Sequence, residues 1–301
     1  MIAKTGPDSH AVKALALDLD GTVLRPDNTL SGRTVAVLKS CMDRGVQVIL
    51  CTGRAIAAAE PYRTAIGAEG PMVYYNGAEV VDMPAGLVLS STLLALDVAD
   101  FCVDLARNRG IHFQVFLPAV PGERGEILMI EKDGPEAEMY RRHTGLRPVL
   151  GDLKKTIAGG KLPGCIKGMF IAEPEAQDAI RPLLLERFGG RIYAARTYPF
   201  FLELMAAGVS KGTGLRAAMK NRGLDAAGVI AMGDEENDLP LFEAAGFSAA
   251  PANAKETVRA AAGTIIGSNA EDGVAAYLEG LFLGGTAGGF PGLSFPPHNS
   301  S

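Results

Sequence analysis

Cysteine is scarce in this chain, and the few cysteines are far apart. They are Cys41, Cys51, Cys102 and Cys165, with no C-x-x-C pair and no flanking histidine pattern. Disulfide frameworks and structural zinc sites need closely and regularly spaced ligands. The spacing therefore argues against both kinds of site and predicts four reduced, mostly buried thiols.

Long apolar runs are also absent. No run approaches the roughly 18 apolar residues that would indicate a membrane span. Residues 1–12 are polar and mixed in charge, without the apolar stretch of a signal peptide. We therefore expect a cytoplasmic protein with no membrane partner.

An excess of basic residues is missing too. The chain has 29 Lys and Arg against 34 Asp and Glu, a formal net charge of -5. Proteins that bind nucleic acid usually carry a basic face, so nucleic acid is not expected as a partner. An acidic chain can still bind a phosphate in one pocket, because that needs only one or two cations and some backbone N–H groups.

What the chain does contain is an alternation of short apolar runs with amphipathic segments. Strands are predicted at 13–18, 46–51 and 72–75, with a helix after Ser31 and another over 55–66. This βαβαβ order is typical of a parallel sheet with right-handed crossovers. The same rhythm resumes near the C-terminus, with elements predicted at 211–222, 229–232, 238–245 and 272–282.

A segment of different character separates the two halves. A hairpin over 79–89 leads away from the predicted sheet, and short strands and helices follow, with a loop predicted over 154–164. The insert, roughly 110 residues, has the size of a domain. We predict an α/β protein made of three parts: a Rossmann-like parallel-sheet core (1–84 and 200–283), an inserted α+β cap domain (85–199) and a flexible C-terminal tail (284–301).

The strongest local signal is D-L-D-G-T, which begins at Asp18, directly after the first predicted strand. In an open parallel sheet, ligands bind beyond the carboxyl ends of the strands, and Asp18 falls at that edge. Asp20 lies two residues further on, and Gly21 permits a tight turn. Two carboxylates this close can divide the work, one as a nucleophile on phosphorus and the other as an acid and base.

Three further motifs follow later strands or open a helix. Thr52-Gly53-Arg54 offers a hydroxyl and close backbone N–H groups for a phosphate, and Ser210-Lys211-Gly212 offers an ammonium. The run G-D-E-E-N-D over 233–238 offers hard oxygen ligands suited to magnesium. Taken singly, these motifs are also typical of a helix cap, a surface lysine and an acidic helix start. The prediction depends on their occurring together at the ends of distant strands.

This set of motifs, in this order, resembles the haloacid dehalogenase superfamily of phosphohydrolases. The resemblance spans residues 13 to about 283 and is to the Cof-like branch, which carries an α+β cap between the second and third motifs. Asn76-Gly77-Ala78 before the insert, F-L-E-L-M before Ser210 and P-A-N-A at 251–254 also match, the last with a small departure from the family's usual M-G-N-A.

The resemblance implies a role for each motif residue. Asp18 is the nucleophile and a magnesium ligand, and Asp20 is the general acid and base, with its backbone carbonyl also on the metal. Asp234 is a further magnesium ligand. The residues implied to bind the transferring phosphoryl group are Thr52, Gly53, Lys211 and Asn237, of which Lys211 is also catalytic. Those implied in the surrounding shell are Glu235 and Asp238, with Asp238 orienting Lys211 or a metal-bound water.

The implied function is a Mg²⁺-dependent phosphatase that hydrolyses small phosphate monoesters, sugar phosphates first, through an aspartyl-phosphate. Two alternatives stay open: a phosphosugar mutase that uses the same two aspartates, and a non-catalytic regulatory binding protein on the same fold. The sequence predicts a small phosphorylated metabolite as partner and leaves the oligomeric state undetermined. Five cap side chains are candidates to reach a substrate but are expected to be ordinary surface residues: His112, Arg141, Arg142, Lys167 and Arg196.

Overall fold

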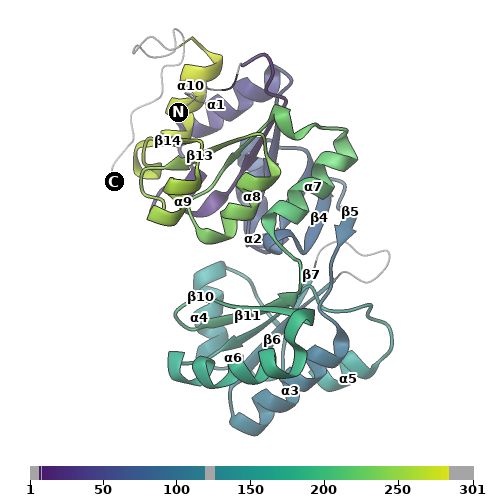
Figure 1. Ribbon diagram of the computed structural model, residues 1–301. Coiled ribbons are helices and arrows are strands. Elements are labelled where there is room, and N and C mark those ends of the chain that lie inside the picture. Colours follow the sequence, from purple (N-terminus) through teal and green to yellow (C-terminus); the bar gives the residue numbers. More distant parts are fainter. Residues whose placement is uncertain (1–6, 8, 119–125, 285–301) are drawn as a thin grey trace, which may run out of the picture.

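The computed structural model describes residues 7, 9–118 and 126–284, which form two lobes (Figure 1). The upper lobe contains a five-stranded sheet in the order β14-β13-β12-β1-β2, and every neighbouring pair of strands in it is parallel. The strands are β1 (Ala14–Leu17), β2 (Gln47–Leu50), β12 (Val229–Met232), β13 (Phe247–Pro251) and β14 (Thr264–Ile266). The predicted parallel α/β core is confirmed.

Helices cover both faces of this sheet, and β1 shows why. Leu15 and Leu17 belong to the apolar cluster on one face, whereas Ala14 and Ala16 belong to the cluster on the other. A strand that is buried on both faces reads as a continuous apolar run, as β1 does. The helices on the leucine side are α1 (Gly32–Asp43), α2 (Ile56–Ile66) and α10 (Gly273–Phe282). Those on the alanine side are α7 (Lys211–Arg222), α8 (Leu239–Ala244) and α9 (Glu256–Ala261).

A second, antiparallel sheet extends this lobe. It consists of β3 (Gly70–Tyr74), β4 (Glu79–Met83) and β5 (Leu87–Ser91), and one parallel bridge between Cys51 and Val73 joins β3 to the end of β2. The hairpin expected to lead away from the sheet was therefore placed wrongly. Its first strand pairs with β3 and stays in the upper lobe.

The lower lobe is built on a six-stranded sheet in the order β10-β11-β9-β6-β7-β8, antiparallel except for β7 beside β8. Its strands are β6 (His112–Pro118), β7 (Glu126–Ile130), β8 (Val149–Leu150), β9 (Lys167–Ile171), β10 (Ile192–Tyr198) and β11 (Phe201–Ala206). Three helices pack on the face turned away from the upper lobe: α3 (Leu96–Arg109), α5 (Leu153–Ala158) and α6 (Pro174–Phe188). The fourth helix, α4 (Pro135–Thr144), contributes Tyr140 to the apolar cluster shared with the upper lobe.

Helix α5 corrects the loop expected over 154–164. The Asp152 side chain accepts a hydrogen bond from the Lys155 backbone N–H and caps the helix, and Leu153 and Ile157 are buried one turn apart. A single capped turn with two apolar residues is enough for a short helix when the lobe buries them.

The β-pairings also move the expected domain boundaries. Residues 87–91, predicted as cap, pair with β4 of the upper lobe, and residues 201–206, predicted as core, pair with β9 and β10 of the lower lobe. The chain crosses between the lobes near Leu93 and again near Ala207. We therefore propose residues 94–207 as the cap, because hydrogen bonds between strands outweigh the sequence's turn signals at Pro84 and Pro199.

Three other expectations concern the cysteines, the tail and the membrane. All four cysteines are free and buried, as predicted. The expected flexible tail lies outside the described residues apart from Gly284. No helix in the described parts of the chain combines the length and apolar character needed to cross a membrane.

Candidate active site

Three motif residues come together because their strands are neighbours. β1 lies between β2 and β12, and Asp18, Thr52 and Asp234 follow these strands at the same edge of the sheet. This is the carboxyl edge, where open α/β sheets bind their ligands. Residues more than 200 positions apart in sequence thus meet, as the paired Thr22 and Asp234 show directly.

Lys211 lies at the centre of the site. Its ammonium Nζ is 2.7 Å from Asp18 Oδ1 and 2.7 Å from Asp238 Oδ1, and its side chain is only 1% exposed. Burial disfavours the charged ammonium, but the two carboxylates outweigh this effect and raise the pKa of Lys211 above its ordinary value. The lysine therefore places a fixed positive charge beside Asp18.

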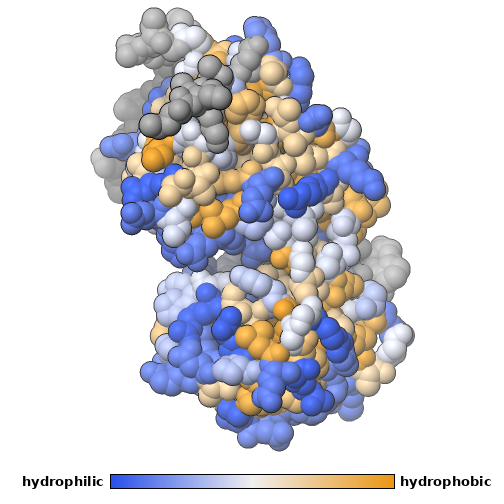
Figure 2. Space-filling view, viewed as in Figure 1, coloured by the Kyte–Doolittle hydropathy of each residue, from blue (hydrophilic) through white to orange (hydrophobic). Residues whose placement is uncertain are grey.

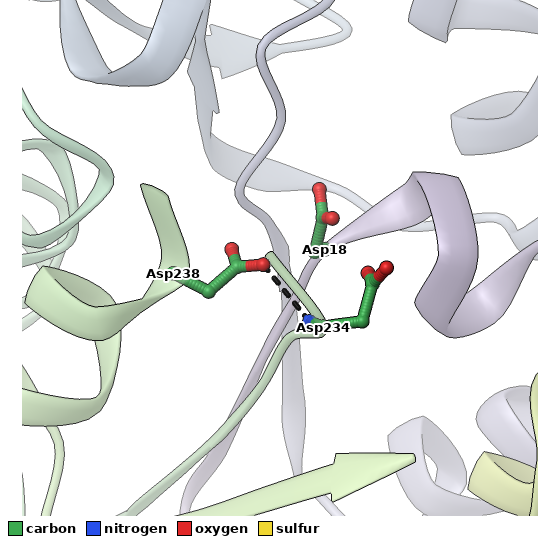
Figure 3. Close-up of side chains that lie close together, drawn as sticks. All are labelled: Asp18, Asp234 and Asp238. Atoms are coloured by element: carbon green, nitrogen blue, oxygen red, sulfur yellow. Dashed lines mark hydrogen bonds between the residues drawn. The ribbon is translucent and has the colours of Figure 1, made fainter. Parts of the chain in front are cut away.

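Asp238 holds this arrangement with both of its oxygens. Oδ1 binds Lys211, and Oδ2 accepts hydrogen bonds from the backbone N–H groups of Asp234 and Glu235, each at 3.0 Å. Figure 3 shows the bond from the Asp234 backbone. Its carboxylate is fully committed to protein donors. Asp238 therefore connects the lysine to the loop that carries Asp234.

A tight contact fixes the carboxylate of Asp234. Its Oδ1 accepts a 2.7 Å hydrogen bond from the Thr22 hydroxyl. Gly21 has a left-handed backbone (φ +73°), and a Cβ at this position would lie 2.1 Å from Asp234 Oδ2. Only glycine fits against the carboxylate, which explains the glycine of the D-L-D-G-T motif.

The acidic residues here suit a hard divalent cation. Carboxylate oxygens of Asp18, Asp234 and Asp238 lie within 4.8 Å of one another, and all three side chains are buried (Figure 3). Burial raises the pKa of Asp18 well above its usual range despite Lys211, and it raises the pKa of Asp234 to about 6. Buried carboxylates have raised pKa values when too little positive charge lies near them, and a bound cation would supply that charge. Because Asp238 is committed, Asp18 and Asp234 are the residues that could hold the metal.

The carboxylate of Asp20 does not join this cluster. It turns to Arg54, whose Nε lies 2.8 Å from Oδ2 and whose Nη2 lies 2.5 Å from Oδ1. Arg54 also lies against the ring of Tyr62, with 5.0 Å between Cζ and the ring centroid. The Thr52-Gly53-Arg54 motif was singled out in the sequence, but the arginine received no role. The sequence feature that could have identified Arg54 was its position in the Thr52-Gly53-Arg54 motif, which follows the strand next to the one that ends at Asp18.

The remaining motif residues lie in or next to the lining of the cavity that Asp18 also borders. Asn237 donates a 3.0 Å hydrogen bond to Asn76 Oδ1, and a Cβ on Gly53 would lie 3.0 Å from the same oxygen. Gly53 and Asn237 border the cavity described below, whereas Thr52 is fully buried beneath them. Glu235 also borders it and is paired with Lys255 at 2.8 Å. Asn76, matched in the sequence only as part of a motif, is thus a further polar residue of the site.

A cavity of about 360 Å³ lies between the lobes. Its core side is formed by Asp18, Asp20, Gly53, Arg54, Asn76, Lys211, Glu235 and Asn237, among others. Its cap side includes Tyr140, His143, Lys167, Met169, Tyr198, Phe201 and Glu203. Figure 2 shows a recess between the two lobes with hydrophilic side chains along its border.

The cap side contradicts one expectation. Lys167, predicted as a surface residue, is 3% exposed and lines the cavity. Its signal was a lysine inside the apolar run I-K-G-M-F-I. The other four candidates lie away from this cavity: Arg141 and Arg142 pair with Glu138, Arg196 pairs with Asp178, and His112 contacts Gln114.

Comparison with known proteins agrees with this architecture. The sequence profile of the haloacid dehalogenase-like hydrolases matches residues 15–278. The chain is 28% identical over 271 residues to the 5-amino-6-(5-phospho-D-ribitylamino)uracil phosphatase YitU of Bacillus subtilis, covering 89% of this chain and 97% of that protein. It is similar to the crystal structure of a haloacid dehalogenase-like hydrolase from Bacteroides thetaiotaomicron, with a TM-score of 0.81 and 25% identity over 90% of this chain and 100% of that one.

The cap has a counterpart of known type. The subclass IIB sugar phosphatase BT4131 shares the fold, with a TM-score of 0.70 and 18% identity over 89% of this chain and 98% of that one. The match of the family profile, the strand-end site and the α+β cap lead to one conclusion. The chain belongs to the haloacid dehalogenase-like hydrolase family, in its Cof-like branch, and is a phosphohydrolase.

Proposed function

We propose that this protein is a Mg²⁺-dependent phosphatase that hydrolyses small phosphate monoesters through an aspartyl-phosphate on Asp18. One observation carries the proposal: Asp18 lies at the cavity floor, 2.7 Å from the buried ammonium of Lys211. Phosphoryl transfer asks mainly for positioning and for stabilisation of charge, and an anionic nucleophile needs positive charge beside it to approach an anionic phosphate.

In the first half-reaction, a carboxylate oxygen of Asp18 bonds to phosphorus and the bond from phosphorus to the leaving oxygen breaks. Asp20 gives a proton to the leaving oxygen. In the second half-reaction, Asp20 takes a proton from water, whose oxygen bonds to phosphorus and releases Asp18 and inorganic phosphate. Lys211 neutralises the transferring group, and Gly53 and Asn237, which border the cavity, orient it. Thr52, predicted to bind the phosphate, is buried and supports the Gly53 turn by accepting a hydrogen bond from the Arg54 backbone N–H.

Asp18 and Asp234 would hold the metal, together with the backbone carbonyl of Asp20. When bound, Mg²⁺ would supply positive charge that reduces repulsion between the nucleophile and the phosphate. The donors are oxygens only, which favours magnesium over zinc. Glu235 lies at the rim of this site, and its pairing with Lys255 suits a supporting role.

The substrate is expected to be a small phosphorylated metabolite. YitU is named for a phosphorylated uracil derivative and BT4131 for sugar phosphates. Both kinds of compound are small phosphate esters. Sugar phosphates, placed first by the resemblance, stay a prediction, and so does a cytoplasmic location. A cavity of about 360 Å³ is at the lower end of the usual range for small-molecule sites.

The test is a panel of about a hundred phosphorylated metabolites assayed with Mg²⁺, with Asp18→Asn as the control for contaminating phosphatases. Release of inorganic phosphate by the wild type alone supports the proposal. Retention of the phosphoryl group on a product, with dependence on a bisphosphate primer, would instead indicate the mutase. Binding of metabolites without turnover of any of them would indicate the regulatory protein.

A further inference from the structure

The cap side of the cavity carries a connected group of aromatic rings, here called the aromatic wall: Tyr140, His143, Tyr198 and Phe201. The ring centroids of His143 and Tyr198 are 4.7 Å apart, those of Tyr198 and Phe201 are 5.1 Å apart, and those of Tyr140 and Phe201 are 5.6 Å apart. Rings at such distances hold one another in place. The wall is therefore a preformed surface, contributed by α4 and by strands β10 and β11.

The wall is graded from buried to open. Phe201 and Tyr140 are 3% and 4% exposed, whereas Tyr198 is 44% exposed and His143 is also exposed. Partial burial and the positive charge of Arg54 lower the pKa of His143 below its ordinary value. Tyr198 and His143 thus remain two accessible, planar side chains in the cavity lining.

The cavity lining also contains a buried ion pair. Lys167 Nζ lies 2.9 Å from Glu203 Oε1, and the two side chains are 4% and 9% exposed. The ammonium also lies 4.7 Å from the ring centroid of Phe116 and 5.5 Å from that of Tyr75. Burying two charges costs more free energy than their attraction commonly returns, so the pair is weak support for stability. Its place in the cavity lining suggests a different use.

The strand register aims both features into the cavity. On β9, Lys167 and Met169 are two residues apart, and so are Phe201 and Glu203 on the adjacent strand β11. Alternate residues of a strand share a face. This face presents aromatic or apolar side chains with one cation and one anion among them.

We propose that the aromatic wall and the Lys167–Glu203 pair select phosphate monoesters whose leaving alcohol carries a planar nitrogen heterocycle. The ring stacks on Tyr198 and His143, the Lys167 ammonium donates to an acceptor on its edge, and the Glu203 carboxylate accepts from a donor there. This assignment rests on the proposed phosphatase function and narrows its substrate class. It competes with the sugar phosphates that the resemblance placed first.

The test compares kcat/KM of the intact protein, with Mg²⁺, on three phosphate monoesters and one acyl phosphate. Pyridoxine 5′-phosphate has a hydrogen-bonding heterocycle and no aldehyde to react with lysines. Benzyl phosphate has a ring without a polar edge, glucose 6-phosphate has a non-aromatic ring of similar size, and acetyl phosphate has almost no leaving group for the cap to contact. We expect kcat/KM to be highest for pyridoxine 5′-phosphate. It should be about tenfold lower for benzyl phosphate, which lacks the polar edge, and about tenfold lower again for glucose 6-phosphate, which lacks the stacking ring.

Variants assign the two contributions. Tyr198→Leu should lower kcat/KM about tenfold for both aromatic esters and much less for acetyl phosphate, whose acetate has no ring to stack, while Tyr198→Phe, which keeps the ring, should lose much less than Tyr198→Leu. Tyr193→Leu is the matched control, because Tyr193 is on the same strand, is also 44% exposed and is not among the described residues that line the cavity. The double variant Lys167→Met/Glu203→Met, which leaves no unpaired charge, should reduce pyridoxine 5′-phosphate to the level of benzyl phosphate.

The possible outcomes separate this inference from the proposed function. A preference for glucose 6-phosphate, with acetyl phosphate still hydrolysed, overturns the heterocycle and leaves the phosphatase intact. An equal loss on all four compounds in Tyr198→Leu, with a lowered unfolding temperature, shows a structural role and also overturns it. If the wild type hydrolyses none of the four compounds, the inference fails, and the panel of about a hundred metabolites alone decides the proposed function.

Discussion

Asp20 and Arg54 form a two-point ion pair, with Arg54 Nε 2.8 Å from Asp20 Oδ2 and Nη2 2.5 Å from Oδ1. The pair joins the turn after β1 to the turn after β2. It holds the proposed acid and base at the cavity, and Arg54 is itself positioned by Tyr62. Two-point pairs of this kind fix orientation as well as charge.

The first prediction concerns this pair. Arg54→Met should lower kcat about tenfold on phenyl phosphate and much less on p-nitrophenyl phosphate, because the second leaving group needs little protonation. Asp20→Asn should show the same dependence more strongly. Arg33→Met is the matched control. Arg33 in α1 makes a comparable two-point pair with Glu279 in α10, and neither residue is in the cavity lining. An equal loss on both esters would mean that Arg54 acts on binding and not through Asp20.

The second prediction concerns the nucleophile. Asp18→Asn should remove turnover by at least about 10⁴-fold, because a neutral amide cannot form the aspartyl-phosphate. The side chain is similar in size, so the circular dichroism spectrum should be unchanged. A phosphoryl group trapped on residue 18 of the wild type, found by mass spectrometry after acid quenching and missing in the variant, is the direct measurement. Wild-type rates in purified Asp18→Asn would falsify the assignment.

The third prediction concerns the metal requirement. EDTA should stop turnover and Mg²⁺ should restore it, whereas Ca²⁺ should bind and support little activity, because its longer bonds and looser geometry misplace the nucleophile. Zn²⁺ should not replace Mg²⁺ efficiently, since no soft donor lies among the described residues of the acidic cluster. Full activity after exhaustive chelation would rule out a metal-dependent reaction.

The fourth prediction concerns the pH dependence of metal binding. Burial raises the pKa of Asp234 from 3.8 to about 6, so in this pH range the folded, metal-free protein binds a proton that the unfolded chain does not. Its unfolding free energy should therefore fall as the pH rises through this window. A cation must displace the same proton, so Mg²⁺ should raise the unfolding temperature more at about pH 7.5 than at about pH 5.

The control for the fourth prediction is Asp234→Asn, which carries no titrating carboxyl. It should bind Mg²⁺ weakly at either pH and show a much smaller stabilisation. A wild-type stabilisation by Mg²⁺ that is the same at both pH values would contradict the assigned role of Asp234.

The fifth prediction concerns Asp238. Asp238→Ala leaves Lys211 with one carboxylate and frees the backbone N–H groups of Asp234 and Glu235. We expect a loss of about 3 kcal/mol in the unfolding free energy, measured by urea denaturation, since one partner of a buried pair has been removed. Asp178→Ala should cost much less, because its pair with Arg196 is exposed. Similar losses in the two variants would show that the Asp238 network is not a stabilising unit.

Several features of the fold could be predicted from the sequence because they are local. An apolar strand followed by D-L-D-G-T identifies a strand end, and Ser31 caps α1 as expected, with its side chain accepting from the Thr34 N–H. The helix at Lys211–Arg222 and the strand at Val229–Met232 have the predicted bounds. Each depends on neighbours within a few residues, where composition and periodicity act directly.

Other features depended on contacts between distant segments. The prolines at 84 and 199 suggested domain boundaries, but pairing with β4, β9 and β10 decided where β5 and β11 belong. The loop expected over 154–164 contains a helix because the cap buries Leu153 and Ile157. Strand pairing and burial are set by the whole fold, and local turn signals carry no information about them.

The site divides in the same way. The sequence by itself determined which residues are proposed to carry the chemistry, Asp18, Asp20, Lys211 and Asp234, because each stands in a short motif at a strand or helix end. The tertiary structure alone decided that Arg54 pairs with Asp20 and that both oxygens of Asp238 accept hydrogen bonds from protein donors. It also decided that Lys167 and Glu203 line the cavity together. The physical reason is that an ion pair forms wherever the fold brings two charges within a few ångströms, and sequence separation sets no limit on that distance.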